Sequence, residues 1–171
     1  MVAVWGEALS QSHDRRDGAP DWIDTGLLNE LDGRLWHATS AAAYWGILAE
    51  KFILASAPGK YNGFAKRIGG VSLFDLAWPD PRPPISHWSQ WLSFADQDVW
   101  YWLEIDRIKA AEQILSPDKA LEHWRGIEPG EGGLIIGGIE AVHLGPVAIA
   151  HVTRTMEISR SGWKELAPGK C

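Results

Sequence analysis

The sequence predicts one α+β domain, since short strand candidates lie on both sides of a few helix candidates within 171 residues. A chain of this length can bury a real hydrophobic core as a single domain. The clearest strand covers residues 99–105, VWYWLEI, whose odd-numbered residues are apolar and share one face. The clearest helix start is Ser40, which stands as an N-cap before an apolar stretch.

The first third of the chain is expected to form two helix–strand units. Tyr44, Ile47 and Leu48 are spaced at i, i+3 and i+4, so the helix expected at 41–51 should bury a single apolar stripe. We expect, in order, a loop at 10–21, a helix capped by Asp24 or Thr25 that runs to Leu31 before Gly33, a strand at 34–38, a helix at 41–51 and a strand at 52–55.

The middle of the chain is rich in turn-forming residues. Glycines predict a long loop at 56–70, followed by a strand at 71–76. The proline-rich segment at 78–84 excludes regular structure, because proline fixes φ and has no N–H to donate. Ser86 is placed to cap a helix that runs to about Phe94.

The last third combines short helices with late strands. Asp106 is placed to cap the first of these helices. Gly137-Gly138 should form a bulge or bend within a strand. We expect helices at 107–115 and 117–124, a glycine-rich loop at 126–133, and strands at 134–144 and 147–155 separated by a Gly145-Pro146 break.

Composition and charge limit the classes of function. The net charge of -6 argues against a general nucleic-acid binder, which needs a basic surface. A single cysteine, Cys171, provides neither a disulfide framework nor a thiolate metal site. Mean hydropathy is -0.16, and no apolar run approaches the roughly 20 residues that span a bilayer. The sequence also lacks a secretory leader pattern at its start. We therefore expect a cytoplasmic protein without membrane contact.

Several familiar catalytic motifs are absent from the sequence. It has no GxxxxGK[ST] phosphate loop, no GxGxxG turn, no GxSxG elbow and no HExxH zinc pattern. We predict no metal, and we expect His87, His143 and His151 to be structural. Eleven tryptophans are expected mainly in the core, with a tryptophan-rich binding surface as the alternative.

The segment LWHATS at 35–40 combines a strand end with a capped helix start. The imidazole of His37 would then lie where backbone N–H groups point outward, which suits a ligand that carries hydroxyls and an amide. The alternative is a core histidine bonded to the backbone beside an ordinary Thr/Ser cap.

The longer segment LWHATSAAAYWGILAEKFIL resembles the opening unit of the ADP-ribosyltransferases. The resemblance implies a split mixed β-sheet core with flanking helices, and NAD as substrate. By position, His37 would hold a ribose hydroxyl and the backbone of Ala38 would hold the nicotinamide amide. Thr39 and Ser40 would lie beside them.

Two later segments, VWYWLEIDRIKA and IEAVHLGPVAIAHV, resemble strands of the DNA-modifying ADP-ribosyltransferase toxins in the same order. Arg67 occupies the place of an arginine in those toxins. Other branches of the family have a tyrosine or a serine at the second position of their motif, and Ser72 and Tyr101 are both candidates for it here. The Glu-x-Glu and Gln-x-Glu signatures are absent, because Gly138-Ile139 precede Glu140. The resemblance implies an N-terminal extension with a short helix at 1–33, an ADP-ribosyltransferase-like catalytic domain at 34–160 and a C-terminal tail at 161–171.

Glu140 is the expected catalytic carboxylate. Cleavage of the nicotinamide–ribose bond develops positive charge on the ribose, which an ionised carboxylate can stabilise. A glutamate in an otherwise apolar strand would be desolvated unless it borders a cleft, although an edge strand facing water would also accommodate it. Glu104 is the rival carboxylate. Arg67 would either contact the NAD diphosphate or be a solvated loop cation.

The resemblance implies a mono-ADP-ribosyltransferase that transfers ADP-ribose from NAD to a macromolecule, with protein slightly favoured over nucleic acid. A toxin, an antiviral effector and a phage-encoded inhibitor are all compatible contexts. The alternatives are an NAD glycohydrolase or RNA 2′-phosphotransferase of the same fold, and a non-catalytic binding module that uses its tryptophan-rich surface. The oligomeric state stays open.

Overall fold

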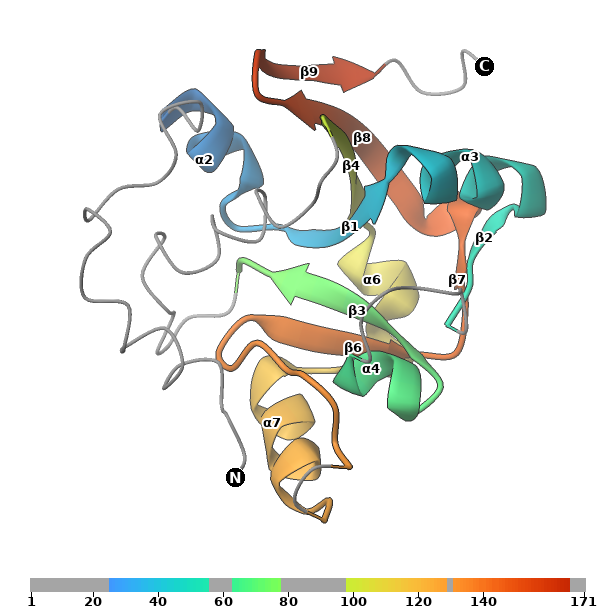
Figure 1. Ribbon diagram of the computed structural model, residues 1–171, viewed down its shortest axis with the longest axis vertical. Coiled ribbons are helices and arrows are strands. Elements are labelled where there is room, and N and C mark those ends of the chain that lie inside the picture. The colour runs from blue at the N-terminus through green and yellow to red at the C-terminus, as the bar shows by residue number, and fades with distance from the viewer. Residues whose placement is uncertain (1–24, 56–62, 78–97, 129–130, 167–171) are drawn as a thin grey trace.

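The computed structural model describes residues 25–55, 63–77, 98–128 and 131–166 (Figure 1). The expected loop at 10–21, the Asp24 cap, the proline-rich segment at 78–84, the helix from Ser86 to Phe94 and His87 lie outside these residues. None of the described helices is both long and apolar enough to cross a membrane.

A seven-stranded sheet forms the centre of the described structure, and a two-stranded sheet lies beside it. The order of the large sheet is β5-β6-β3-β1-β4-β8-β9, and the small sheet is β2-β7. The strands of the large sheet are β1 (Leu35–Ser40), β3 (Gly70–Asp75), β4 (Val99–Ile105), β5 (Ile114–Leu115), β6 (Glu140–Leu144), β8 (Val152–Ser159) and β9 (Gly162–Leu166). The small sheet pairs β2 (Phe52–Ile53) with β7 (Val147–Ala148).

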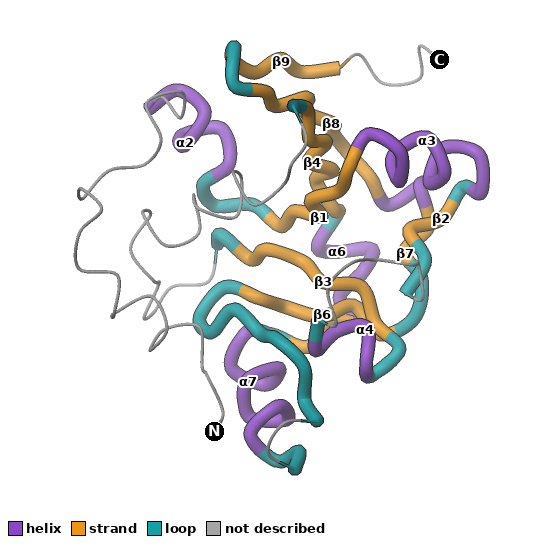
Figure 2. Tube along the Cα trace, in the orientation of Figure 1, coloured by secondary structure: helices purple, strands orange, loops and turns teal. Residues whose placement is uncertain are grey.

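Short helices surround the large sheet (Figure 2). In this view α3 lies beside the end of β1, whereas α7 and α4 lie on the side of β6. The helices are α2 (Thr25–Leu31), α3 (Ala41–Glu50), α4 (Phe64–Arg67), α6 (Arg107–Ala110) and α7 (Pro117–Arg125), with 3₁₀ turns η2 (Ala111–Gln113) and η3 (Ile149–His151).

The predicted α+β class is confirmed, but the expected mixed sheet is wrong for the described strands. Every pairing between them is antiparallel, and the one parallel contact among the described residues is an isolated bridge between Gly63 and Leu134. The alternation of side chains along a strand is the same in parallel and antiparallel sheets, so it does not reveal strand direction.

The Ser40 cap of α3 forms as the sequence predicts, but β1 runs to Ser40 and not to Ala38, so His37 lies within the strand and not at its end. The backbone N–H of Ala43 donates to the Ser40 side chain at 3.2 Å, which satisfies one of the unpaired donors of the first helical turn. Tyr44 and Ile47 are buried, so the predicted stripe faces the core. Lys51 ends the helix in the left-handed region, with φ 64°.

Aromatic side chains fill much of the core on one face of the sheet. Trp36 and Trp102 are 0% and 1% exposed, and their rings meet edge to face. Phe74 stacks on Trp102 with ring centroids 5.2 Å apart. Leu27 and Leu31 of α2 complete this cluster, so the short helix expected within an N-terminal extension packs into the core. These two tryptophans therefore have the packing role expected for most of the eleven.

Several element boundaries differ from the predicted ones. The helix predicted at 107–115 ends at Ala110, because Ile114 and Leu115 leave it to pair with β6. The loop predicted at 56–70 contains α4, and part of that loop lies outside the described residues. Residues 162–166, expected within a C-terminal tail, form β9 along β8.

The strand predicted at 134–144 begins only at Glu140. Residues before it form a turn, in which the Glu140 N–H donates to the Ile136 carbonyl at 2.9 Å. Gly138 has φ 85° there, a conformation that glycine adopts without a Cβ clash. Gly137-Gly138 therefore belongs to a turn ahead of the strand. Similarly, η3 interrupts the strand predicted at 147–155.

Candidate active site at the opening between β1 and β3

Two central strands of the large sheet separate along their length. β1 pairs with β3 through only two residue pairs, Leu35–Asp75 and Trp36–Phe74. On its other side β1 pairs with β4 over five residues. Figure 1 shows β1 and β3 close together near α2 and diverging toward α3 and α4. The β1–β3 ladder therefore ends at Trp36, and we call the part of the sheet beyond it, where these two strands no longer pair, the opening.

Backbone hydrogen-bonding groups face this opening. The Leu76 N–H donates to the Arg34 carbonyl at 2.8 Å, so the even-numbered residues of this part of the chain point their backbone groups toward β3. Ala38 follows Trp36 on that edge and has no residue of β3 paired with it. Within the described part of the chain, the Ala38 N–H and C=O have no hydrogen-bond partner, and both face the opening.

His37 contacts β3 across the opening. Its Nδ1 lies 3.0 Å from the Ser72 carbonyl oxygen. A carbonyl oxygen only accepts, so Nδ1 carries the proton and Nε2 of the neutral ring is an acceptor. Burial lowers the pKa of His37, against an opposing effect of the Ser72 carbonyl. The imidazole is therefore neutral near pH 7.

Glu140 lies at the start of β6, and its carboxylate is held at both oxygens. The Ser72 hydroxyl donates to Oε1 at 2.8 Å, and the Ile136 backbone N–H donates to Oε2 at 2.7 Å. The residue is only 4% exposed, and β6 lies between β5 and β3, which excludes the edge-strand alternative.

Burial raises the pKa of Glu140 from the ordinary 4.5 to about 7, although the hydrogen bonds from Ile136 and Ser72 oppose the rise. Glu140 therefore exists in both protonation states near neutrality. A carboxyl group poised in this way is typical of acid–base and charge-stabilising sites.

The turn ahead of β6 supplies a contact that the sequence analysis missed. Its backbone closes through the Glu140 N–H and the Ile136 carbonyl, and this places the Ile136 N–H at the carboxylate of Glu140. The available sequence signal was the Gly137-Gly138 pair, since glycine permits the positive φ of the turn.

Of the two candidates for the second motif position, the structure brings Ser72 to Glu140 and keeps Tyr101 elsewhere. The Tyr101 ring stacks on Tyr44 with centroids 4.1 Å apart, and its hydroxyl donates to Glu157 at 3.2 Å. Burial raises the pKa of Tyr101, with a further contribution from Glu157. Tyr101 therefore belongs to the packing under α3.

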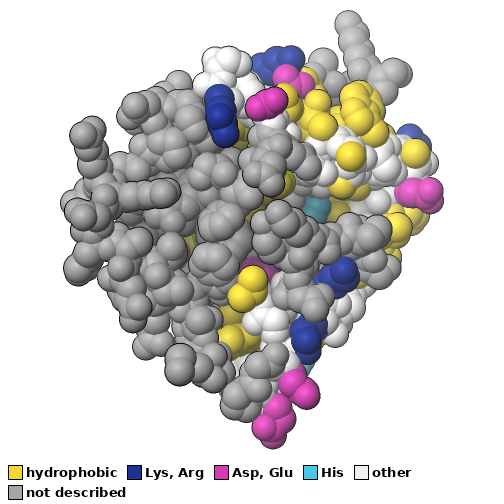
Figure 3. Space-filling view, viewed as in Figure 1, with side chains coloured by type: hydrophobic (Ala, Val, Ile, Leu, Met, Phe, Trp, Pro, Cys, Tyr) yellow, Lys and Arg dark blue, Asp and Glu magenta, His cyan; other side chains and the backbone are white. Residues whose placement is uncertain are grey.

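The other residues expected near NAD occupy different positions. Thr39 is buried, and Ser40 serves as the N-cap of α3. Arg67 is the exposed last residue of α4, and basic side chains stand over that helix in the space-filling view (Figure 3). Among the described residues, no contact joins the Arg67 side chain to Glu140 or His37.

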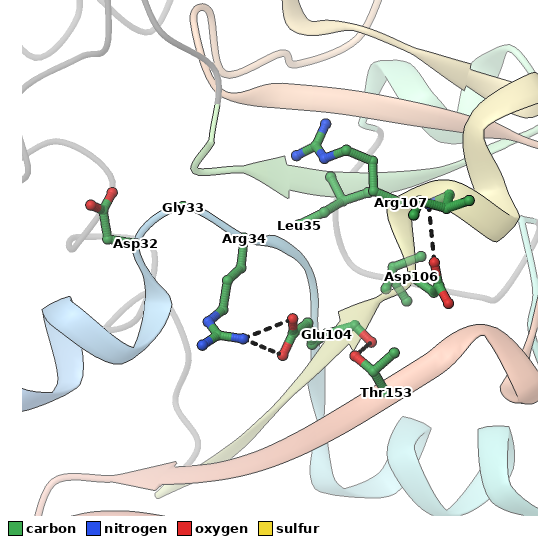
Figure 4. Close-up of a pocket in the computed structure, with 10 residues that line it drawn as sticks. Asp32, Gly33, Arg34, Leu35, Glu104, Asp106, Arg107 and Thr153 are labelled. Atoms are coloured by element: carbon green, nitrogen blue, oxygen red, sulfur yellow. Dashed lines mark hydrogen bonds and ion pairs between the residues drawn. The ribbon is translucent and has the colours of Figure 1, made fainter.

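Glu104 lies on β4, on the side of β1 away from the opening, and pairs with Trp36 in the register. Arg34 Nη1 donates to both of its carboxylate oxygens, at 3.0 and 3.1 Å (Figure 4). The pocket there has a volume of about 540 Å³ and is also lined by Asp106 and Arg107. The carboxylate of Asp106 caps α6. The charged side chains at this pocket are thus engaged with other protein groups.

His143, the described histidine of β6, is packed away from Glu140. His143 is 1% exposed, and its Nδ1 lies 3.2 Å from the Gly145 carbonyl. Since successive side chains of a strand alternate, His143 is on the face of β6 opposite Glu140. In the described ranges, no group of three or more His, Cys, Asp and Glu side chains could hold a metal ion.

Comparison with known proteins adds no assignment to this geometry. No family model, no curated protein and no solved structure matches the chain.

Proposed function

We propose that the protein is a mono-ADP-ribosyltransferase, which cleaves the nicotinamide–ribose bond of NAD and transfers ADP-ribose to a macromolecule, with protein favoured as the acceptor. One observation carries the proposal. Ser72 contacts both expected residues where β1 and β3 stop pairing: its hydroxyl donates to Glu140, and its carbonyl oxygen lies 3.0 Å from His37 Nδ1. Beside it, the Ala38 backbone has no hydrogen-bond partner among the described residues. The opening also supports the split sheet that the resemblance to ADP-ribosyltransferases implies.

The backbone of Ala38 suits the carboxamide of nicotinamide. A carboxamide presents a donor N–H and an acceptor C=O side by side, and Ala38 presents the complementary pair along one strand edge. Two such hydrogen bonds would hold the carboxamide along the edge of β1, as the backbone of a neighbouring strand is held, and would thereby orient the nicotinamide ring. His37 Nε2, which is an acceptor in the neutral imidazole, could then accept a hydrogen bond from a ribose hydroxyl.

Glu140 would act on the reacting ribose. When the C–N bond to nicotinamide breaks, its electron pair leaves with nicotinamide and positive charge develops on the ribose. An ionised carboxylate stabilises that charge, and the effect is large where water is excluded. The acceptor nucleophile then bonds to the ribose carbon, and its proton passes to Glu140 and from there to solvent.

The charge of NAD itself would prepare Glu140 for this step. The pyridinium ring of NAD carries a positive charge, and an opposite charge within a few ångströms favours the ionised form of a carboxyl group. A carboxyl group whose pKa is about 7 in the free protein would therefore lose its proton when NAD binds. Ser72 and Ile136 would keep the carboxylate oriented through their hydrogen bonds.

The test is incubation of the pure protein with labelled NAD and a cell lysate, followed by identification of the labelled molecules by mass spectrometry. Glu140→Gln keeps the shape of the side chain and removes its charge, so labelling should fall about 100-fold or more. Glu104→Gln is the matched control, because Glu104 pairs with Arg34 away from the opening, and it should retain labelling.

Three outcomes would contradict parts of the proposal. Unchanged labelling by Glu140→Gln would remove the catalytic assignment. Release of nicotinamide by the wild type without a labelled macromolecule would indicate an NAD glycohydrolase. A wild type that neither binds nor consumes NAD would refute the enzyme, and a non-catalytic binding module would then account better for the protein.

A further inference from the structure

The register of β1 and β3 shows which hydrogen bonds the opening omits. Trp36 pairs with Phe74, so a continued antiparallel ladder would place Ala38 opposite Ser72. In that ladder the Ala38 N–H would donate to the Ser72 carbonyl, and the Ser72 N–H would donate to the Ala38 carbonyl. Instead, the Ser72 carbonyl accepts from His37 Nδ1 at 3.0 Å.

We infer that His37 keeps β1 and β3 apart, because its Nδ1–H donates to the Ser72 carbonyl that the Ala38 N–H would otherwise use. We call this role of His37 the wedge. The imidazole thereby satisfies a partly buried acceptor at the position of the next ladder step. This conformational role belongs to the free protein and goes beyond the proposed reaction with NAD.

The two nitrogens of His37 then have separate tasks. Nδ1 holds the opening through Ser72, whereas Nε2 is left as an acceptor for a ligand. One residue would thus leave the backbone edge of β1 open to a ligand and also supply a side-chain acceptor to that ligand. Without the wedge, the Ala38 backbone and the Ser72 carbonyl would bond to each other in a closed ladder, and neither would remain for a ligand.

Asparagine and alanine separate these tasks experimentally. The side-chain amide nitrogen of asparagine occupies nearly the position of histidine Nδ1 and can donate to the Ser72 carbonyl, but asparagine has no atom in place of Nε2. His37→Asn should therefore keep the wedge, and His37→Ala should remove it. The start of α3 directly after β1 offers a competing cause of the separation, and that cause is the same in both variants.

The measurement is backbone amide hydrogen exchange at Ala38 and Ser72, followed by NMR without NAD. In His37→Ala the ladder should close, and both amides should exchange roughly five- to tenfold more slowly than in the wild type, as expected for a net hydrogen bond of about 1 kcal/mol. His37→Asn should exchange as the wild type does. Unchanged or faster exchange at both amides in folded His37→Ala would assign the opening to α3 and overturn the wedge.

A second measurement on the wild type alone keeps the inference testable if His37→Ala does not fold. The ¹⁵N shifts of the imidazole should show the proton on Nδ1, together with a coupling across the hydrogen bond to the Ser72 carbonyl carbon. A neutral ring with its proton on Nε2 would overturn the wedge. Both measurements omit NAD, so a failure of the proposed enzyme function would leave their outcome unaffected.

Discussion

Replacing Glu140 with glutamine should stabilise the protein at alkaline pH and change its stability much less in acid. The folded state raises the pKa of Glu140 from 4.5 to about 7, so the folded carboxyl group holds its proton more tightly than the unfolded one. Below the unfolded pKa the group is protonated in both states. As the pH rises from 4.5 to about 7, ionisation favours the unfolded state progressively, and above that range the cost is constant.

The size of the effect follows from the pKa difference. At about 1.4 kcal/mol per pKa unit, the difference amounts to about 3 kcal/mol near pH 8 and about 1 kcal/mol near pH 5. Glutamine avoids this cost because it is uncharged. Its amide can also retain both contacts, accepting from the Ile136 N–H and donating to the Ser72 hydroxyl oxygen.

The assay is urea unfolding of the wild type and Glu140→Gln at both pH values, compared as free energies of unfolding. Glu104→Gln is again the control, since its partly exposed ion pair should contribute at most about 1 kcal/mol. A variant that is less stable than the wild type near pH 8, or a stability difference that does not depend on pH, would refute the reasoning. Higher stability with lost labelling of an acceptor would be the trade-off typical of active sites.

Three further predictions concern other described residues. Ser72→Ala removes a hydrogen bond that lowers the pKa of Glu140, so the pH midpoint of NAD turnover should move up by about one unit, which a rate–pH profile would reveal. Asp75→Asn disrupts the bidentate pair with Arg107, at 2.6 and 2.8 Å, and should lower the free energy of unfolding by about 2–3 kcal/mol; an unchanged melting temperature would contradict this. Because burial lowers the pKa of His143, its neutral side chain contributes stability above the ordinary pKa of 6.5, and this contribution is lost as the pH falls below 6.5. His143→Asn should therefore flatten the acid dependence of stability in unfolding curves. An equally steep dependence in the variant would argue against this role of His143.

Local signals predicted the elements whose formation depends on nearby residues. The two-faced alternation of 99–105 predicted β4 with its observed bounds, and Ser40 predicted the cap of α3. The strand predicted at 134–144 failed because an apolar run with glycines is compatible with a buried turn as well as a strand. Strand direction and order were not predictable, since they depend on pairings between residues far apart in the chain.

Part of the candidate site followed from the sequence context of single residues, and part depended on how the strands pair. His37 and Glu140 were expected from their sequence context, and the structure places both beside Ser72. The choice between Ser72 and Tyr101 depended on the register of β3 and β6, which brings Ser72 within reach of Glu140. The opening beyond Trp36 depends on hydrogen bonds that are not made, and residue patterns do not encode these.

The central claim is that NAD binds at the opening between β1 and β3. It is tested most directly by titrating ¹⁵N-labelled Glu140→Gln protein, in which the proposed turnover is expected to be lost, with NAD while the amide signals are followed. The account predicts saturable shifts at Ala38 and Ser72, which lie beyond the last β1–β3 pair, and at Ile136, whose N–H donates to Glu140. Shifts confined to the pocket around Arg34 and Glu104, or no saturable shifts, would contradict it.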